Sequence, residues 1–209
     1  MNATLSPLIH LVDDDEAVRS SLALLISTVG LRVQGWSDPQ AFLREFPRGD
    51  IGAIVLDVRM PGISGLTVLE SLVGEGVDQP ILMLTGHATV EMCRRAFKSG
   101  AAEFLEKPVD DEELLEVLRQ AVRRHVSSRE RSRTDQADRA RFAQLSERER
   151  EVLAHIVRGL SNKEIARVLS LSPRTVESHR ANIFAKLESD SLAQLIRHYA
   201  VLVDGEGAP

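Results

Sequence analysis

The segment that decides the fold of this chain is AIVLDVRMPG at residues 53–62. Four consecutive apolar residues end at Asp57, and the proline and glycine that follow predict a turn soon after this aspartate. A short apolar run bounded by a turn is typical of a parallel strand that is buried on both faces. The segment therefore predicts a buried strand that carries one carboxylate at its carboxyl end.

Polar side chains follow other apolar runs in the same half of the chain. Residues 8–12 lead into Asp13 and Asp14, residues 81–84 into Thr85, and residues 104–106 into Lys107. In an open α/β sheet, functional groups converge beyond the carboxyl ends of the strands. We therefore expect one pocket that holds several carboxylates, a hydroxyl group and an ammonium group.

Two kinds of patterning divide the chain. Strand-like runs occur at 8–12, 31–35, 51–56, 80–84 and 102–106. Helical spacing separates them, so the first part is predicted to be an α/β domain with a five-stranded, doubly wound parallel sheet. From residue 145 onward the strand patterns disappear. Four helix starts are predicted there, at the capping boxes Ser146–Glu149 and Ser161–Glu164, at Ser172–Pro173, and near Ser189 or Asp190.

The expected organisation is therefore a first domain at 1–125, a linker at 126–142 and an all-α four-helix domain with a helix-turn-helix at 143–209. The linker residues are polar and contain no Gly or Pro, which favours a partly helical linker over a disordered tether. Residues 1–125 carry 12 basic and 19 acidic side chains, whereas residues 126–209 carry 14 and 12. This asymmetry suggests that the second half binds a polyanion.

Several classes of protein are excluded by composition. No apolar run approaches the roughly 18 residues of a membrane span, and no signal-peptide pattern opens the chain, so a cytoplasmic protein is expected. The single cysteine, Cys93, excludes an internal disulfide framework. We interpret it as a packed side chain, with a redox sensor as the alternative.

The polar strand ends suggest phosphoryl chemistry. Clustered carboxylates cannot all stay ionised unless a cation joins them, and Asp13, Asp14 and Asp57 offer the hard oxygen atoms that Mg²⁺ prefers. Asp57 could attack a phosphoryl donor, because aspartate is an established phosphoryl acceptor. Lys107 would offset charge on the transferred oxygens, and Thr85 would donate a hydrogen bond to the product. A phosphatase with an aspartyl nucleophile and a simple phosphorelay module are the alternatives.

Four motifs in the first half resemble those of a response-regulator receiver domain, over about residues 6–125. They are VDD at 12–14, LDVRMPG at 56–62, LTGH at 84–87 and EKP at 106–108. The resemblance implies a flavodoxin-like fold with Asp57 as the phosphoacceptor, assisted by Thr85 and Lys107. It further implies a cis Lys107–Pro108 bond and a switch made of Thr85 and Phe104. The implied Mg²⁺ ligands are Asp13 (through water), Asp14, Asp57 and the backbone carbonyl of Arg59.

The helix predicted to start at Pro173 has one apolar face and one face of small and polar residues. Small residues at the apex would let it enter a major groove, although an ordinary exposed helix face is the alternative. The segments LSEREREVL at 145–153, GLSNKEIA at 159–166 and SPRTVESH at 172–179 closely resemble the LuxR-type DNA-binding domain. By this resemblance Glu177, Ser178 and Ala181 would face base edges. The resemblance further implies contacts to the DNA backbone from Lys163, Arg174, Thr175, Arg180, Asn182 and Lys186.

Together the two resemblances imply a two-component regulator of the NarL/FixJ family, in its FixJ branch. Such a protein is expected to be phosphorylated by a sensor histidine kinase and to dimerise on phosphorylation. It would then bind paired half-sites in promoter DNA and control transcription with RNA polymerase as a further partner. It would not be an enzyme that turns over a metabolite.

Overall fold

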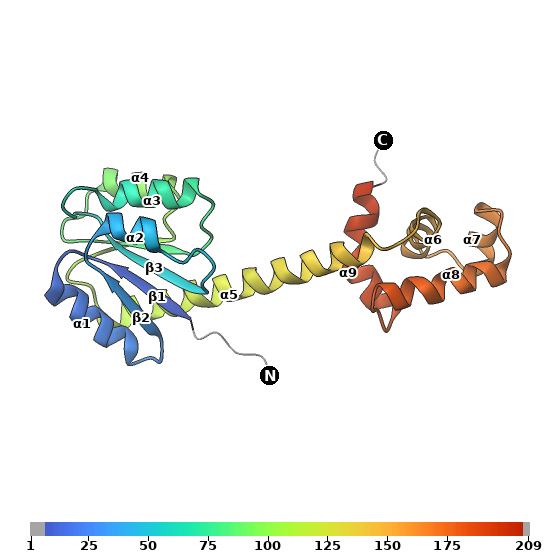
Figure 1. The fold of residues 1–209 in the computed structure, drawn as a ribbon, viewed down its shortest axis with the longest axis horizontal. Coiled ribbons are helices and arrows are strands. Elements are labelled where there is room, and N and C mark those ends of the chain that lie inside the picture. Colours follow the sequence, from blue (N-terminus) through green and yellow to red (C-terminus); the bar gives the residue numbers. More distant parts are fainter. Residues whose placement is uncertain (1–6, 207–209) are drawn as a thin grey trace. The chain divides into compact units, whose positions relative to one another are not determined.

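The computed structural model describes residues 7–206, with side chains for residues 7–203. It divides into two compact units, Met1–Arg129 and Glu130–Pro209. The first unit is an α/β structure and the second is helical (Figure 1). The outermost residues of the predicted domains, 1–6 and 207–209, lie outside the described residues.

The first unit contains the predicted five-stranded parallel sheet, in the order β2-β1-β3-β4-β5. Its strands are β1 (Leu8–Val12), β2 (Arg32–Trp36), β3 (Gly52–Asp57), β4 (Ile81–Thr85) and β5 (Glu103–Glu106). Strand β3 lies between β1 and β4 and is buried along its whole length. This position explains why its sequence is continuously apolar rather than alternating.

Helices cover both faces of the sheet (Figure 1). Helices α2 (Pro39–Glu45), α3 (Gly65–Gly74) and α4 (Val90–Lys98) pack on one face; α1 (Glu16–Ser27) and the first part of α5 (Asp111–Phe142) pack on the other. Alternate residues of β3 enter the two cores, because successive side chains of a strand point to opposite faces. Ile54 and Leu56 belong to the core under α2, α3 and α4, and Val55 to the core under α1 and α5.

A histidine, His10, lies inside the first of these cores. The side chain of His10 is 1% exposed, and the indole Nε1 of Trp36 donates a hydrogen bond of 3.2 Å to His10 Nδ1. Burial lowers the pKa of His10 to about 4, against an opposing effect of Asp50. His10 is therefore neutral in the folded first unit at physiological pH. Trp36 is the single tryptophan of the chain.

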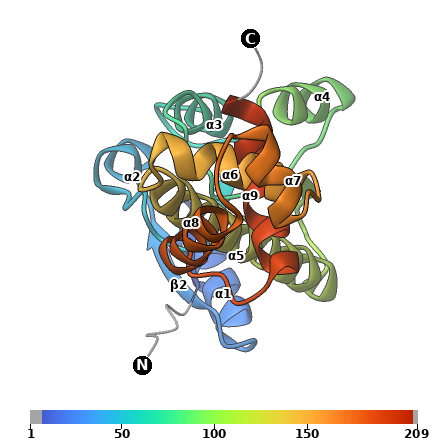
Figure 2. The same ribbon diagram turned by 90° about the vertical axis from the view of Figure 1, so that its right-hand side faces the viewer.

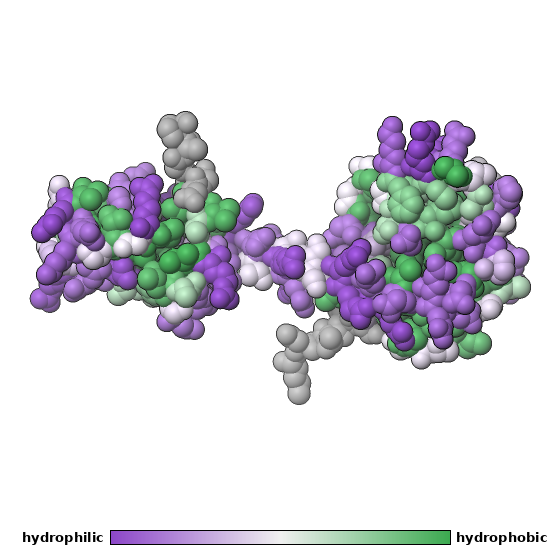
Figure 3. Space-filling view, turned by 180° about the vertical axis from the view of Figure 1, so that it is seen from behind, coloured by the Kyte–Doolittle hydropathy of each residue, from purple (hydrophilic) through white to green (hydrophobic). Residues whose placement is uncertain are grey.

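Helix α5 is one continuous helix that includes the residues predicted to form a linker. His125 holds the first half of this helix against the sheet. Its side chain is 3% exposed, and its Nδ1 lies 3.0 Å from the carbonyl oxygen of Gly52 in β3. One turn later, Arg129 Nε lies 2.8 Å from Asp78 Oδ2. The residues at 130–136 are exposed, and Figure 3 shows a predominantly hydrophilic surface on this stretch.

The second unit contains α6 (Glu147–Val157), α7 (Asn162–Val168), α8 (Pro173–Lys186) and α9 (Leu192–Glu206), with the end of α5 (Figure 2). Both predicted capping boxes and the Ser172 cap are confirmed. Helix α9, however, starts later than predicted. Ser189 still belongs to the end of α8, because its N–H donates to Phe184 O, and Ser191 Oγ accepts from the N–H of Gln194 instead.

Tyr199 closes the core of this second unit. It is 1% exposed, and its hydroxyl lies 3.1 Å from Leu187 O and 3.2 Å from the buried Asp138 on α5. Burial, together with Asp138, raises the pKa of Tyr199 to about 12. Among residues 7–206, no helix has the length and apolarity required to cross a membrane.

Candidate functional site

The structure brings the predicted polar strand ends together. Asp13 follows β1, Asp57 ends β3 and Lys107 follows β5, so all three lie at the carboxyl edge of the sheet. Lys107 Nζ donates hydrogen bonds of 2.6 Å to Asp13 Oδ2 and of 2.6 Å to Asp57 Oδ1. One ammonium group thus bridges two carboxylates that are more than 40 residues apart in sequence.

These carboxylates are almost fully removed from water. Asp13 is 1% exposed and Asp57 is 6% exposed. Burial raises the pKa of Asp57, and the hydrogen bond from Lys107 opposes the rise without cancelling it. Burial alone would lower the pKa of Lys107, but hydrogen bonds to Asp13 and Asp57 outweigh it and raise the pKa above its usual value. Burial therefore disfavours the charged form of Asp57, whereas the two carboxylates keep Lys107 protonated.

The turn after β3 orients the second oxygen of Asp57. The backbone N–H of Arg59 donates to Asp57 Oδ2 at 2.6 Å. The turn closes where Gly65 N donates to Val58 O at 2.9 Å, and a Cβ on Gly65 would lie only 2.0 Å from Asp57 O. Only glycine therefore fits at the start of α3. The sequence analysis missed this residue, although its place directly after the Ser64 helix cap was a usable signal.

The residues present fit a magnesium ion. Within residues 7–203, no group of three or more His, Cys, Asp or Glu side chains is placed to hold a metal alone. Mg²⁺ does not require such a cage, because it keeps several waters and is usually bound through one or two carboxylates. The site offers hard oxygen donors from the buried carboxylates of Asp13 and Asp57, the exposed carboxylate of Asp14 and the backbone carbonyl of Arg59.

Thr85 ends β4 and is completely buried, but its hydroxyl is engaged away from Asp57. It donates to His87 O at 3.2 Å and accepts from His87 N at 3.3 Å, within the loop between β4 and α4. Phe104 is partly buried against the core under α2, α3 and α4. The Lys107–Pro108 bond is cis, as the resemblance implied.

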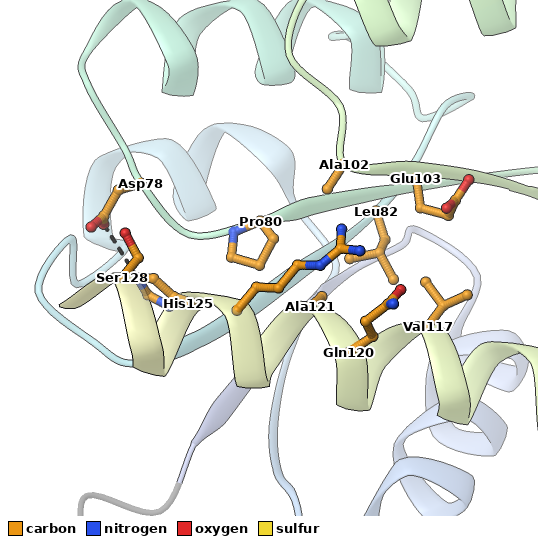
Figure 4. A pocket seen from close by; sticks show the side chains of 11 residues that line it. Asp78, Pro80, Leu82, Ala102, Glu103, Val117, Gln120, Ala121, His125 and Ser128 are labelled. Carbon is orange, nitrogen blue, oxygen red and sulfur yellow. Dashed lines mark ion pairs between the residues drawn. The ribbon is translucent and has the colours of Figure 1, made fainter. Parts of the chain in front are cut away.

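A separate pocket of about 200 Å³ lies under α5 (Figure 4). Pro80 and Leu82 line it from the start of β4, Glu103 from the start of β5, and Ala121 and His125 from α5. These are the amino ends of the strands, whereas Asp57 and Lys107 lie at the carboxyl ends. This hollow is therefore distinct from the carboxylate cluster.

Helix α8 presents the face that the sequence analysis assigned to DNA. Val176, Ile183 and Leu187 are buried in the bundle. The residues predicted to face bases, Glu177, Ser178 and Ala181, are exposed. The residues predicted to contact the DNA backbone are also exposed or partly exposed: Arg174, Thr175, Arg180 and Asn182 on α8, and Lys163 on α7.

Lys186, a further predicted DNA contact, also makes an ion pair within the second unit. Its Nζ lies 2.6 Å from Glu149 Oε2 and 3.3 Å from Gln144 O, so the ammonium is engaged inside the second unit. Glu149 is only 4% exposed; burial alone would raise its pKa, but hydrogen bonds from Lys186 and Ser146 hold it below its usual value. Lys186 therefore neutralises a buried capping carboxylate, and this ion pair would compete with its predicted contact to a DNA phosphate.

Comparisons with known proteins agree with this architecture. The family model described as response regulator receiver domain matches residues 9–119, and the model for bacterial regulatory proteins of the luxR family matches residues 143–199. The chain therefore belongs to the response regulators with a LuxR-type DNA-binding domain. Phosphorylation-dependent control of transcription is the function that this combination implies.

Within this class the chain is FixJ-like. It is 45% identical to the transcriptional regulatory protein FixJ of Azorhizobium caulinodans over 189 residues, which cover 90% of each chain. It is 41% identical to FixJ of Bradyrhizobium diazoefficiens, with 90% of this chain and 92% of the relative covered. The solved structure of full-length FixJ from B. japonicum covers 98% of this chain at 39% identity and a TM-score of 0.60. The structure of the response regulator StyR covers 94% at 36% identity and a TM-score of 0.83.

Proposed function

We propose that a sensor histidine kinase phosphorylates Asp57 and that this modification increases self-association of the protein and its affinity for promoter DNA. The observation that carries the proposal is the pairing of buried Asp57 with Lys107 at 2.6 Å, beside the N–H of Arg59 at 2.6 Å. A carboxylate oxygen of Asp57 forms the new bond to phosphorus, and the bond from phosphorus to the kinase imidazole nitrogen breaks.

The chain's own groups bind and orient the transferred phosphoryl group. Lys107 donates hydrogen bonds to its oxygens and offsets their negative charge. The N–H of Arg59 keeps the Asp57 carboxylate at a fixed angle. Mg²⁺, when bound, would supply further neutralisation of the negative charge on the phosphoryl group. Asp14, Asp57 and the Arg59 carbonyl are its proposed ligands, with Asp13 acting through water.

Phosphorylation then shifts the population of two receiver conformations. The added group carries roughly −1.5 to −2 charges. Thr85 exchanges its hydrogen bonds to His87 for one to the phosphoryl group, and Phe104 repacks against the adjoining core. This change biases an existing equilibrium and requires no new fold.

The second unit delivers the response. Two copies of α8 enter neighbouring major grooves about one helical turn apart. Glu177, Ser178 and Ala181 face base edges, whereas Lys163, Arg174 and Arg180 meet phosphates and Thr175 and Asn182 hold the backbone. The bound dimer acts with RNA polymerase, and this takes place in the cytoplasm. Apart from accepting its own phosphoryl group, the protein turns over no substrate.

The test is sedimentation and DNA binding with and without beryllofluoride and Mg²⁺. The wild type should form dimers and bind DNA more tightly in the presence of this phosphoryl mimic. Asp57→Ala should do neither, whereas Glu112→Gln, at an exposed acid in the first turn of α5, should respond like the wild type. Equal DNA binding by the wild type with and without the mimic would exclude Asp57 as the controlling input.

A further inference from the structure

The loop that connects β4 to α4 is held from the neighbouring strand. Ala88, in the middle of this loop, donates its backbone N–H to Glu106 Oε1 at 2.9 Å. Glu106 is the last residue of β5 and is paired in register with Thr85, the last residue of β4. The carboxylate of Glu106 thus reaches from the end of one strand to the loop that follows the other.

The backbone of Glu106 is a fixed anchor for this contact. Lys107 N donates to Thr85 O at 2.7 Å, directly beyond the paired residues, so both strand ends are held together. The Lys107 ammonium binds Asp13 and Asp57 and is not engaged with its neighbour Glu106. Among the residues with described side chains, Glu106 makes no ion pair. Its carboxylate is therefore available to the loop.

We propose that Glu106 is a positioning residue that latches the β4–α4 loop in the conformation in which the Thr85 hydroxyl faces His87 rather than Asp57. The inference rests on the proposed function, in which Thr85 must turn toward the phosphoryl group. Hydrogen bonds that involve an ionised partner are roughly twice as strong as neutral ones. The latch therefore opposes the switch and sets how much of the receiver is active before phosphorylation.

Chain length couples the latch to the switch hydroxyl. Only two residues, Gly86 and His87, separate Thr85 from Ala88. Each residue spans at most about 3.6 Å, so the loop has little slack. When Thr85 releases the oxygen and the N–H of His87, the segment up to Ala88 must move as well, and the bond to Glu106 must stretch or break.

A second acid on the same strand provides a matched control. Glu103 begins β5, and its Oε1 accepts only from the adjacent N–H of Phe104, at 3.2 Å, in the described part of the chain. Glu103 and Glu106 carry the same charge on one strand, but only Glu106 contacts the β4–α4 loop. A substitution at Glu103 therefore changes charge without releasing the loop.

The experiment compares Glu106→Ala, Glu106→Gln and Glu103→Ala with the wild type by titration with beryllofluoride at fixed Mg²⁺. Glu106→Ala should bind the mimic about three- to tenfold more tightly, since one charge-assisted hydrogen bond no longer opposes the switch. Glu106→Gln keeps an acceptor oxygen and should show a clearly smaller gain. Glu103→Ala should match the wild type.

If Glu106→Ala and Glu106→Gln gain equal affinity for beryllofluoride, the effect comes from the lost charge and the latch is overturned. The latch is also overturned if neither variant gains affinity. Amide hydrogen exchange without any ligand is the independent arm: the Ala88 amide should exchange faster in Glu106→Ala than in the wild type. Unchanged exchange overturns the latch. If the wild type fails to bind beryllofluoride, the proposed function is wrong, but faster exchange would still support the contact.

Discussion

Replacing Lys163 or Lys186 with glutamine should separate two kinds of cation in the second unit. Lys163 and Arg174 are exposed and Arg180 is partly exposed, and within the described residues none of the three makes an ion pair. Lys186 lies 2.6 Å from the buried carboxylate of Glu149. We therefore expect three cations per subunit to be available to DNA phosphates, where the sequence alone suggested four.

The salt dependence of DNA binding measures this difference. Each neutralised phosphate contributes about 0.9 to the slope of log K against log salt concentration. Three contacts per subunit give a slope of about −5.4 for a dimer, whereas four would give about −7.2. Lys163→Gln should make the slope shallower by about 1.8, and Lys186→Gln should leave it unchanged. Lys186→Gln should instead destabilise the second unit by about 1–2 kcal/mol, because Glu149 loses its cation.

The assay is fluorescence anisotropy with a labelled duplex of random sequence, in the presence of beryllofluoride and Mg²⁺, from about 50 to 200 mM salt. Thermal unfolding of the same proteins provides the stability comparison. If Lys186→Gln flattens the slope as much as Lys163→Gln does, the ion pair with Glu149 opens on DNA and our assignment of Lys186 is refuted.

Three further changes concern the receiver. Asp57→Asn should raise the free energy of unfolding at about pH 8 but not at about pH 3, because burial raises the pKa of Asp57 and its charged form is unfavourable above that pKa. Urea unfolding measures this, and an equal difference at both pH values would contradict it. Wild type should lose up to about 3 kcal/mol between pH 6.5 and about 4, where the unfolded chain protonates His10 and the folded chain does not. His10→Gln should lack this part of the loss, so parallel pH curves would exclude His10 as the cause. Gly65→Ala should cost about 1–3 kcal/mol through the clash with Asp57 O, whereas Gly74→Ala, with nothing within 4 Å, is the matched control in thermal unfolding.

Most of the fold could be predicted because its signals are local. The apolar run of β3, and the caps at Ser146, Ser161 and Ser172, need only neighbouring residues to act. The start of α9 was misplaced for the opposite reason. Ser189 has the residue type of a helix cap, but its N–H completes the end of α8 at Phe184, and that geometry depends on how the earlier helix ends.

The candidate site shows the same division. The polar residues at the strand ends were readable, because parallel strands deliver their carboxyl ends to one edge. The pairing of Lys186 with Glu149 joins residues 37 apart, and the contact of Glu106 with Ala88 joins the end of β5 to the loop after β4. Neither leaves a periodic or motif-like trace in the sequence. The residue type alone could therefore not show that Lys186 also neutralises a buried acid.

The distribution of aromatic residues gives the protein two built-in optical reporters. The chain has one tryptophan and one tyrosine; Trp36 lies in the first compact unit and Tyr199 in the core of the second. Indole emission therefore reports on the first unit, and the tyrosine contribution to near-ultraviolet absorption reports on the second. An unlabelled sample can thus reveal whether the two halves melt together or one after the other, and whether a phosphoryl mimic at Asp57 stabilises only the half that binds it.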